Sequence, residues 1–167
     1  MAYDFNADEV FRIAEQIEKN GAEFYNRVAD KTSESVRRFF LDLSSMEKGH
    51  EKVFAAMRSK LTDADRQSGT FDPEGETMNY LMVLAGGGVF DEKARKAFDS
   101  IERLQGDAAM EAALKAALDL EKDTVVFFLG LKELVPDHLG REKLDSILKE
   151  EMKHIRLLGG RLSSIRK

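Results

Sequence analysis

The chain has 167 residues, of which 43% are hydrophobic and 34% charged, so its composition is that of one folded domain rather than a disordered segment. It has no cysteine, which excludes disulfides, zinc–thiolate sites, thiol catalysis and cysteine-ligated iron–sulfur clusters. The 26 basic and 31 acidic residues give a formal net charge of -5, which argues against a nucleic-acid-binding protein.

Two long helical patterns at the start of the chain predict a helical hairpin over residues 7–61. The first runs from about Ala7 to Ala29 and the second from about Ser33 to Leu61. Their apolar residues recur at spacings of three and four, which places them on one face of each helix: Phe11, Ala14, Gly21, Tyr25 and Val28, then Val36, Phe40, Leu43, Phe54 and Met57. The polar break at 30–33 supplies an N-cap, so we expect antiparallel helices.

Residues 62–106 predict a long connection. A turn-rich stretch at 63–75 precedes two shorter helical patterns at 76–85 and 92–104, which a glycine triplet at 86–88 separates. The apolar run at 80–90 has eleven residues, too few to span a bilayer, so we expect no membrane segment. This run could pack over the helices or cover a homodimer interface.

A second hairpin is predicted over residues 107–165. Its first helix runs from about Ala108 to Leu134, after a stop-and-cap signal at Gly106 and Asp107, and its second from about Asp137 to Ile165, after Pro136. The aligned apolar residues are Leu114, Ala117, Val125 and Phe128, then Leu144, Ile147 and Leu158.

Two hairpins joined by a long connection predict an all-α, antiparallel four-helix bundle with one long crossover that contains short helices. This is the connectivity of ferritin-like folds, here in a single domain over 1–167. The alternative is an up-down bundle with an irregular insert. The N-terminal sequence lacks a basic region followed by an apolar one, so we expect no signal peptide and a cytoplasmic protein.

Charged residues interrupt the apolar stripe of every long helix near its middle. They are Glu18 in the first helix, Glu47 and His50 in the second, Glu121 in the third, and Glu151 and His154 in the fourth. The pattern is an internal repeat, because Glu18 and Glu121 are 103 residues apart while the Glu47–Glu151 and His50–His154 offsets are both 104. Each hairpin therefore contributes one Glu and one Glu-x-x-His.

Four carboxylates in one core layer need counter-charge. An unpaired buried carboxylate costs several kcal/mol, and the apolar stripes contain no Lys or Arg. Two divalent cations would balance the four carboxylates, with the imidazoles as neutral ligands. One Glu from each of two helices plus Glu-x-x-His from each of the other two is the ligand set of di-iron and di-manganese carboxylate proteins. Oxygen and nitrogen donors without thiolate suit Fe or Mn, with Zn a further possible occupant.

The alternative interpretation is a set of surface charges, with histidines satisfied at the edge of the core. The third histidine, His138, falls outside the pattern, and we expect it to be solvated or to cap a helix.

The sequence resembles the rubrerythrin family of ferritin-like di-iron proteins through Glu18-x6-Tyr25, Glu47-x-x-His50, Glu121 and Glu151-x-x-His154. The resemblance implies two Fe ions, with Glu18 and Glu121 as terminal ligands, Glu47 and Glu151 as bridges, and one histidine on each metal. It also implies that Tyr25 lies beside the cluster and hydrogen-bonds a ligand carboxylate, although packing in the core is an alternative role.

The resemblance implies an oxidoreductase that reduces hydrogen peroxide or dioxygen. Typical family members carry a rubredoxin module, which this chain lacks, so a separate rubredoxin-like protein or flavoprotein would donate electrons. Many also have an extra Glu where this chain has Thr124, and Phe128 stands where the repeat would place a second tyrosine. The alternatives are iron binding, ferroxidation or storage without peroxidase turnover, and a bundle in which metal serves only stability or sensing.

Overall fold

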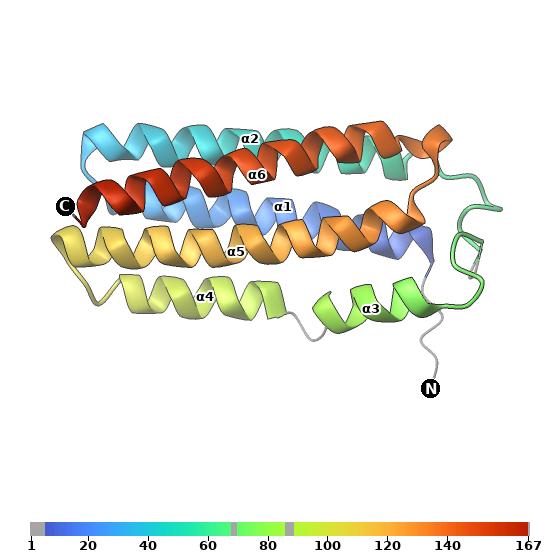
Figure 1. The fold of residues 1–167 in the computed structure, drawn as a ribbon, viewed down its shortest axis with the longest axis horizontal. Helices are drawn as coiled ribbons and strands as arrows, with labels where there is room; N and C mark the ends of the chain where they lie inside the picture. Colours follow the sequence, from blue (N-terminus) through green and yellow to red (C-terminus); the bar gives the residue numbers. More distant parts are fainter. Residues whose placement is uncertain (1–5, 68–69, 86–88, 167) are drawn as a thin grey trace.

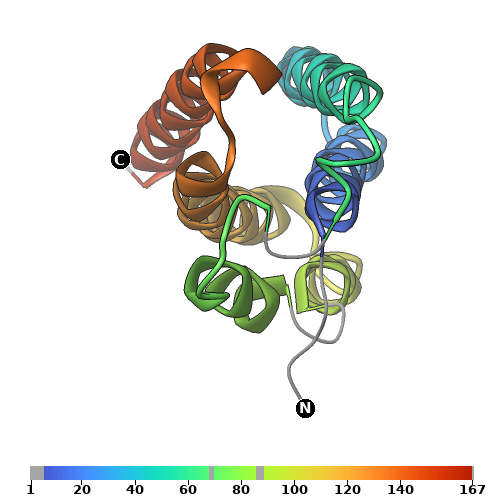
Figure 2. The ribbon, with the colours of Figure 1, turned by 90° about the vertical axis from the view of Figure 1, so that its right-hand side faces the viewer.

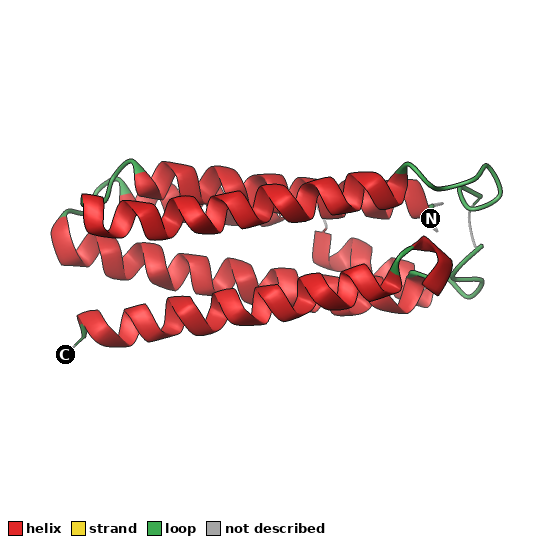
Figure 3. Ribbon diagram, turned by 90° about the horizontal axis from the view of Figure 1, so that it is seen from above, coloured by secondary structure: helices red, strands yellow, loops and turns green. Residues whose placement is uncertain are grey.

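The computed structural model describes residues 6–67, 70–85 and 89–166. All regular structure in these ranges is helical, which confirms the predicted all-α class (Figure 3). Four long helices lie side by side as a bundle: α1 (Ala7–Ala29), α2 (Glu34–Arg58), α5 (Gly106–Leu134) and α6 (Arg141–Ile165) (Figure 1). The connection between α2 and α5 contains α3 (Glu76–Ala85) and α4 (Val89–Ile101).

The order of the helices is that of a ferritin-like bundle. The α1–α2 turn lies at one end of the molecule and the α5–α6 turn at the other (Figure 1). Between them, α3 and α4 run back along the bundle, so that α2 and α5 point in the same direction. An up-down bundle would make α2 and α5 antiparallel, and that alternative is therefore wrong.

Local sequence explains where the helices begin. At the start of α1 the side chain of Asn6 accepts a hydrogen bond from the Glu9 amide, and the Glu9 carboxylate accepts one from the Asn6 amide, forming a capping box. The predicted start of the last helix at Asp137 is wrong, because residues 137–139 form a separate 3-10 turn and Gly140 has a φ of 106°. The cap signal at Gly106 is also displaced, since Gly106 already lies in α5 and Gln105 is its N-cap.

The crossover helices cover one side of the bundle. Helix α3 packs on α5, and α4 packs on both α5 and α1 (Figure 2). Leu81 of α3 is fully buried, and a Cβ at Gly130 of α5 would lie only 2.9 Å from its side chain. Tyr80 and Val83 are 45% and 79% exposed, so the apolar stretch that begins at residue 80 only partly packs on the bundle; its glycines 86–88 lie outside the described residues.

The apolar core is divided into two clusters, one toward each end of the bundle. One includes Phe11, Phe54, Phe127, Phe128 and Leu144, and the other includes Tyr25, Phe40, Leu43, Leu114 and Leu158. In every long helix the interrupting charged residues lie between a segment that packs in one cluster and a segment that packs in the other. A charged layer therefore separates the two clusters. Among the described residues, no helix is long and apolar enough to span a bilayer.

Candidate metal centre

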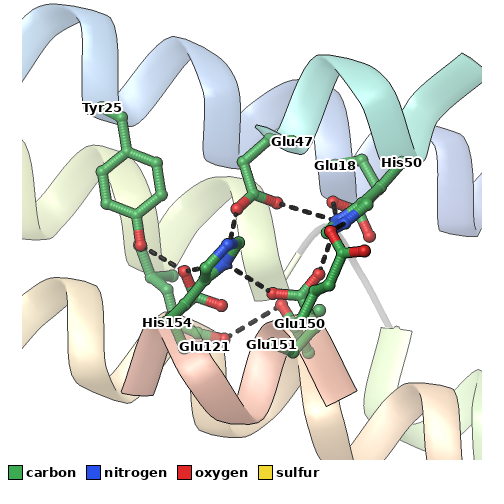
Figure 4. A network of polar contacts seen from close by, with 10 residues as sticks. Glu18, Tyr25, Glu47, His50, Glu121, Glu150, Glu151 and His154 are labelled. Carbon is green, nitrogen blue, oxygen red and sulfur yellow. Dashed lines mark hydrogen bonds and ion pairs between the residues drawn. The ribbon is translucent and has the colours of Figure 1, made fainter. Parts of the chain in front are cut away.

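The residues that interrupt the four apolar stripes meet between the two clusters (Figure 4). Every one of them is at most 5% exposed: Glu18, Glu47, His50, Glu121, Glu151 and His154. The alternative of solvated surface charges is therefore wrong.

The ligand atoms of these side chains form two groups, and within each group they lie within 4.8 Å of one another. One group contains Glu18, Glu47, His50 and Glu151, and the other contains Glu47, Glu121, Glu151 and His154. Glu47 and Glu151 belong to both groups, so each of these carboxylates could bridge two neighbouring cations. Each group also has one terminal glutamate and one histidine of its own.

His50 directs one ring nitrogen into the cluster. Its Nδ1 lies 2.7 Å from Glu151 Oε1 and 3.5 Å from Glu18 Oε2. Its Nε2 points outward and lies 2.9 Å from Glu150 Oε2, in hydrogen-bond geometry. With the proton of a neutral ring on Nε2, the lone pair of Nδ1 faces the carboxylates, which is the orientation that a metal ligand requires.

His154 approaches the same layer from the opposite hairpin. Its Nδ1 lies 3.0 Å from Glu151 Oε2, 3.1 Å from Glu47 Oε1 and 3.5 Å from Glu121 Oε1. Its Nε2 is buried and has no hydrogen-bond partner in the described chain. The two imidazoles stack with ring centroids 5.9 Å apart. The two histidines thus occupy corresponding positions, but only the Nε2 of His50 has a hydrogen-bond partner among the described residues.

Several buried oxygen and nitrogen atoms that could ligate a metal lack a hydrogen bond within the described residues. They include both oxygens of Glu18, Glu47 Oε1, Glu151 Oε1 and His50 Nδ1. His50 Nδ1 and Glu151 Oε1 are 2.7 Å apart yet are not oriented for a hydrogen bond to each other. Buried polar atoms normally have partners, so converging oxygens and nitrogens without them fit a bound cation. The donor types suit Fe or Mn.

In the metal-free protein, the pKa values of the four glutamates show how the buried cluster limits its negative charge without a cation. Burial raises the pKa of Glu18, Glu47 and Glu121 well above the usual carboxyl range, and neighbouring carboxylates raise it further. Burial also opposes charge on Glu151, but its hydrogen bond with His154 and its close contact with the His50 imidazole outweigh burial and lower the pKa of Glu151 to about 2.

The two imidazoles balance part of the negative charge. Burial disfavours their charged forms, yet the facing carboxylates prevail and raise the pKa of His50 to about 9 and that of His154 to about 12. Both are therefore protonated at neutral pH in the metal-free protein. Metal binding must displace these protons, because a protonated imidazole cannot ligate.

Tyr25 lies at the edge of the cluster and its hydroxyl donates a hydrogen bond to Glu121 Oε1 (Figure 4). Burial and the adjacent Glu121 raise the pKa of this phenol well above its usual value, so it remains a donor. The ring is 2% exposed and belongs to one apolar cluster, so Tyr25 both packs in the core and orients a carboxylate.

The three positions that depart from the pattern have distinct environments. Thr124 Oγ1 donates to the Leu120 carbonyl oxygen at 3.0 Å and lies beside the cluster. Phe128 is buried with its ring centroid 4.9 Å from that of Phe54, so it contributes no polar group. His138 is exposed, as expected for a residue outside the ligand pattern.

Glu150 was missed by the sequence analysis. A signal was present in the repeat, because the residue before Glu151 is Glu150, whereas the residue before Glu47 is Met46. Only His50 therefore has a carboxylate on its outer nitrogen among the described residues.

Replacing Glu150 by alanine is expected to weaken the binding of one metal about 10–100-fold, because outer hydrogen bonds fix the orientation of a ligating imidazole. Binding of the metal nearest His154 should change little. Chelator competition with the metal-loaded protein measures both affinities. Glu142→Ala removes an exposed glutamate from the same helix and is the matched control. Equal weakening in both variants would show that Glu150 does not position His50.

Comparison with family models matches residues 1–58 to rubrerythrin. The matched segment covers α1 and α2 and thus includes Glu18, Tyr25, Glu47 and His50. Comparison with curated proteins gave no match, and comparison with solved structures gave none either. This match of the first hairpin to the family model confirms the recognition from sequence, and the described helices form a ferritin-like bundle.

Proposed function

We propose that the protein is a non-haem di-iron oxidoreductase of the rubrerythrin type, which reduces hydrogen peroxide or dioxygen. The observation that carries the proposal is the pair of ligand groups that share Glu47 and Glu151. Two Fe ions in these groups would supply the redox chemistry, and Mn or Zn could occupy the same ligands. The proposed ligands are the six buried residues: Glu18, Glu47, His50, Glu121, Glu151 and His154.

The residues of the chain hold and shield this site. Glu47 contacts His154 and Glu151 contacts His50, and both carboxylates belong to both ligand groups, so they would help to hold both cations. The Tyr25 hydroxyl donates a hydrogen bond to Glu121 and so fixes the orientation of that carboxylate. The apolar clusters on both sides exclude water from the layer, which strengthens the electrostatic interactions inside it.

The electron source in this proposal is a separate rubredoxin-like protein or flavoprotein, and the setting is the cytoplasm. We also propose a homodimer. The exposed side chains of Tyr80 and Val83 on α3 support an interface on that side of the bundle, because they leave apolar surface uncovered.

The alternative function is iron binding with ferroxidation, or storage or sensing, without coupled peroxidase turnover. The hydrogen bond of Thr124 to a backbone carbonyl favours it, because this position offers no seventh carboxylate that could exchange with a histidine. In that case the protein would oxidise iron without sustained reduction of peroxide. Ferritin-type storage would also require a large hollow shell, which light scattering would detect.

Anaerobic loading with ferrous iron tests the proposal. We expect about two iron ions per chain, as the ligand count predicts. Stoichiometric peroxide should then change the optical spectrum of the reduced protein rapidly, and a rubredoxin-like or flavin reductant should restore it. Binding of two irons with no spectral response to peroxide would contradict the peroxidase and leave the alternative.

A further inference from the structure

A surface pocket of about 270 Å³ lies between α1 and α4, and none of the six proposed metal ligands lines it. Helix α4 packs beside α1 on this side of the bundle (Figure 2). The lining residues come from these two helices: Asn20, Glu23, Phe24, Arg27, Ala94 and Arg95. Pockets that bind small molecules have volumes of roughly 300–1,000 Å³, so this one has the size for a small organic ligand.

Two arginines supply the positive charge of the pocket. Arg27 lies in the last turn of α1 and Arg95 lies in α4, and both residues are exposed. Elsewhere arginines pair with carboxylates across helices, as Arg58 does with Glu15 at 2.8 Å. Neither Arg27 nor Arg95 has a carboxylate oxygen within 4.0 Å among the side chains that the structure describes. Two guanidinium groups without a carboxylate partner therefore line one pocket.

The side chain of Arg27 is held across the pocket by an aromatic ring. Its guanidinium carbon lies 3.5 Å from the ring centroid of Phe98 in α4, and Phe98 is 2% exposed. Glu23 precedes Arg27 by four residues, a spacing that commonly gives an ion pair in a helix, yet these two residues do not pair. A cation–π contact supplies no hydrogen-bond acceptor lone pair, so the N–H groups of Arg27 remain as donors for a ligand.

The remaining lining residues limit which anion fits. Carboxylate and phosphate groups match the planar fork of an arginine, which can donate two parallel hydrogen bonds to either of them. Phe24 and Ala94 add apolar surface beside the two arginines. Glu23 lines the pocket as well, so its lining has two positive charges and one negative charge. This balance favours an anion with one charged group and an apolar part.

We infer that the pocket between α1 and α4 is a binding site for a small organic anion. The carboxylate or phosphate group of the ligand lies between Arg27 and Arg95, and its apolar part contacts Phe24 and Ala94. This site is separate from the metal centre, and the inference does not depend on the proposed function. Because the pocket opens at the surface, a ligand reaches it without separation of the long helices.

Titration of the full-length protein with phenyl phosphate, benzoate and inorganic phosphate tests the site, with calorimetry and the amide NMR signals of α1 and α4 as readouts. Phenyl phosphate should bind about tenfold more tightly than inorganic phosphate, because its ring covers the apolar wall. The ratio of phenyl phosphate to benzoate affinity identifies the preferred charged group. Benzylamine has a similar ring with the opposite charge and should not bind. Binding of benzylamine equal to that of the anions, or no binding of either aromatic anion at millimolar concentration, would overturn the inference.

Arg27→Gln and Arg95→Gln should each weaken the binding of phenyl phosphate about tenfold or more, because each removes charge-assisted hydrogen bonds to the anion. Arg95 makes no ion pair with a described side chain, so its substitution leaves the packing of the bundle intact. The matched control is Arg38→Gln, which removes the same charge from an exposed residue of α2 outside the pocket. It should change the affinity less than about twofold at physiological salt. Equal weakening by the three substitutions would show unspecific charge attraction and would overturn the inference.

Glu23→Gln tests the same site in the opposite direction. It removes a negative charge that repels the anion, so phenyl phosphate should bind up to about fivefold more tightly. Glu34→Gln, at an exposed residue of α2 outside the pocket, is the matched control and should bind as the wild type does. Weaker binding by Glu23→Gln would contradict the placement of the anion. A crystal structure with phenyl phosphate should show its phosphate between Arg27 and Arg95, and a phosphate bound elsewhere would refute the assignment.

Discussion

Glu151→Gln is expected to abolish the binding of both metals and to destabilise the metal-free protein as well. Glu151 belongs to both ligand groups, so its loss leaves neither group complete. In the metal-free protein it is the carboxylate that contacts both protonated imidazoles, and these contacts lower its pKa to about 2. Removing one partner from a buried ion pair typically costs about 3–5 kcal/mol.

Glu18→Gln is the matched variant, and its expected effect on the metal-free protein has the opposite sign. Both Glu18 oxygens are buried without a hydrogen bond, and burial and the neighbouring carboxylates raise its pKa well above the usual range. Replacing such a strained acid with a neutral amide should leave the metal-free protein unchanged or stabilise it by about 1 kcal/mol. The metal nearest His50 should nevertheless be lost.

Urea unfolding at neutral pH in the presence of a chelator measures both variants. The stabilising contribution of Glu151 is fully present above the ordinary carboxyl pKa and disappears as the pH falls through about 2, because its folded-state pKa is lowered. Neutral pH therefore reports the whole difference. Equal destabilisation by the two substitutions would contradict the inference that Glu151, rather than Glu18, carries the stabilising negative charge of the cluster.

Metal loading is expected to raise the thermal stability of the protein strongly. A ligand present at about 1,000 times its dissociation constant adds about 4 kcal/mol per site. For two sites in a chain of this size, the midpoint of thermal unfolding should rise by roughly 15–30 °C. Calorimetry of the metal-free and iron- or manganese-loaded protein measures this shift, and a chelator should reverse it.

The metal-dependent shift should also depend on pH. His50 and His154 are protonated at neutral pH in the metal-free protein, with pKa values of about 9 and about 12, and each must lose its proton to bind a cation. The stabilisation should therefore decrease as the pH is lowered from 8 to about 6. A protein that is stable and binds neither iron nor manganese would contradict the role of the cluster.

Sequence spacing could predict the helices and the layer of interrupting charges because both follow from helical periodicity. The stripe residues Phe40, Leu43 and Leu114 are fully or nearly fully buried, as the spacing of three and four requires. Val36 and Val125 are only half-buried. The spacing could not predict this difference, because it does not reveal how far each residue of a stripe lies from the neighbouring helices.

Other features of the site could not be predicted because they depend on the packing of different helices. The Tyr25–Glu121 hydrogen bond joins residues 96 apart, and only the family resemblance suggested it. The contact of Glu150 with His50 depends on how α2 and α6 pack across the bundle. A small cavity beside Gly21 is lined by side chains of α1, α2 and α5 together, and no local sequence pattern encodes such a space.

The division of the core into two apolar clusters has a consequence for how the bundle can open. Helices usually fray from their ends, but here the apolar clusters lie toward the two ends of the bundle and the polar layer lies at its middle. Without cations, this polar layer is stabilised only by contacts that involve protonated side chains. We therefore expect amide hydrogen exchange in the metal-free protein to be fastest, among buried helical segments, around the mid-helix turns, and cation binding to slow it there.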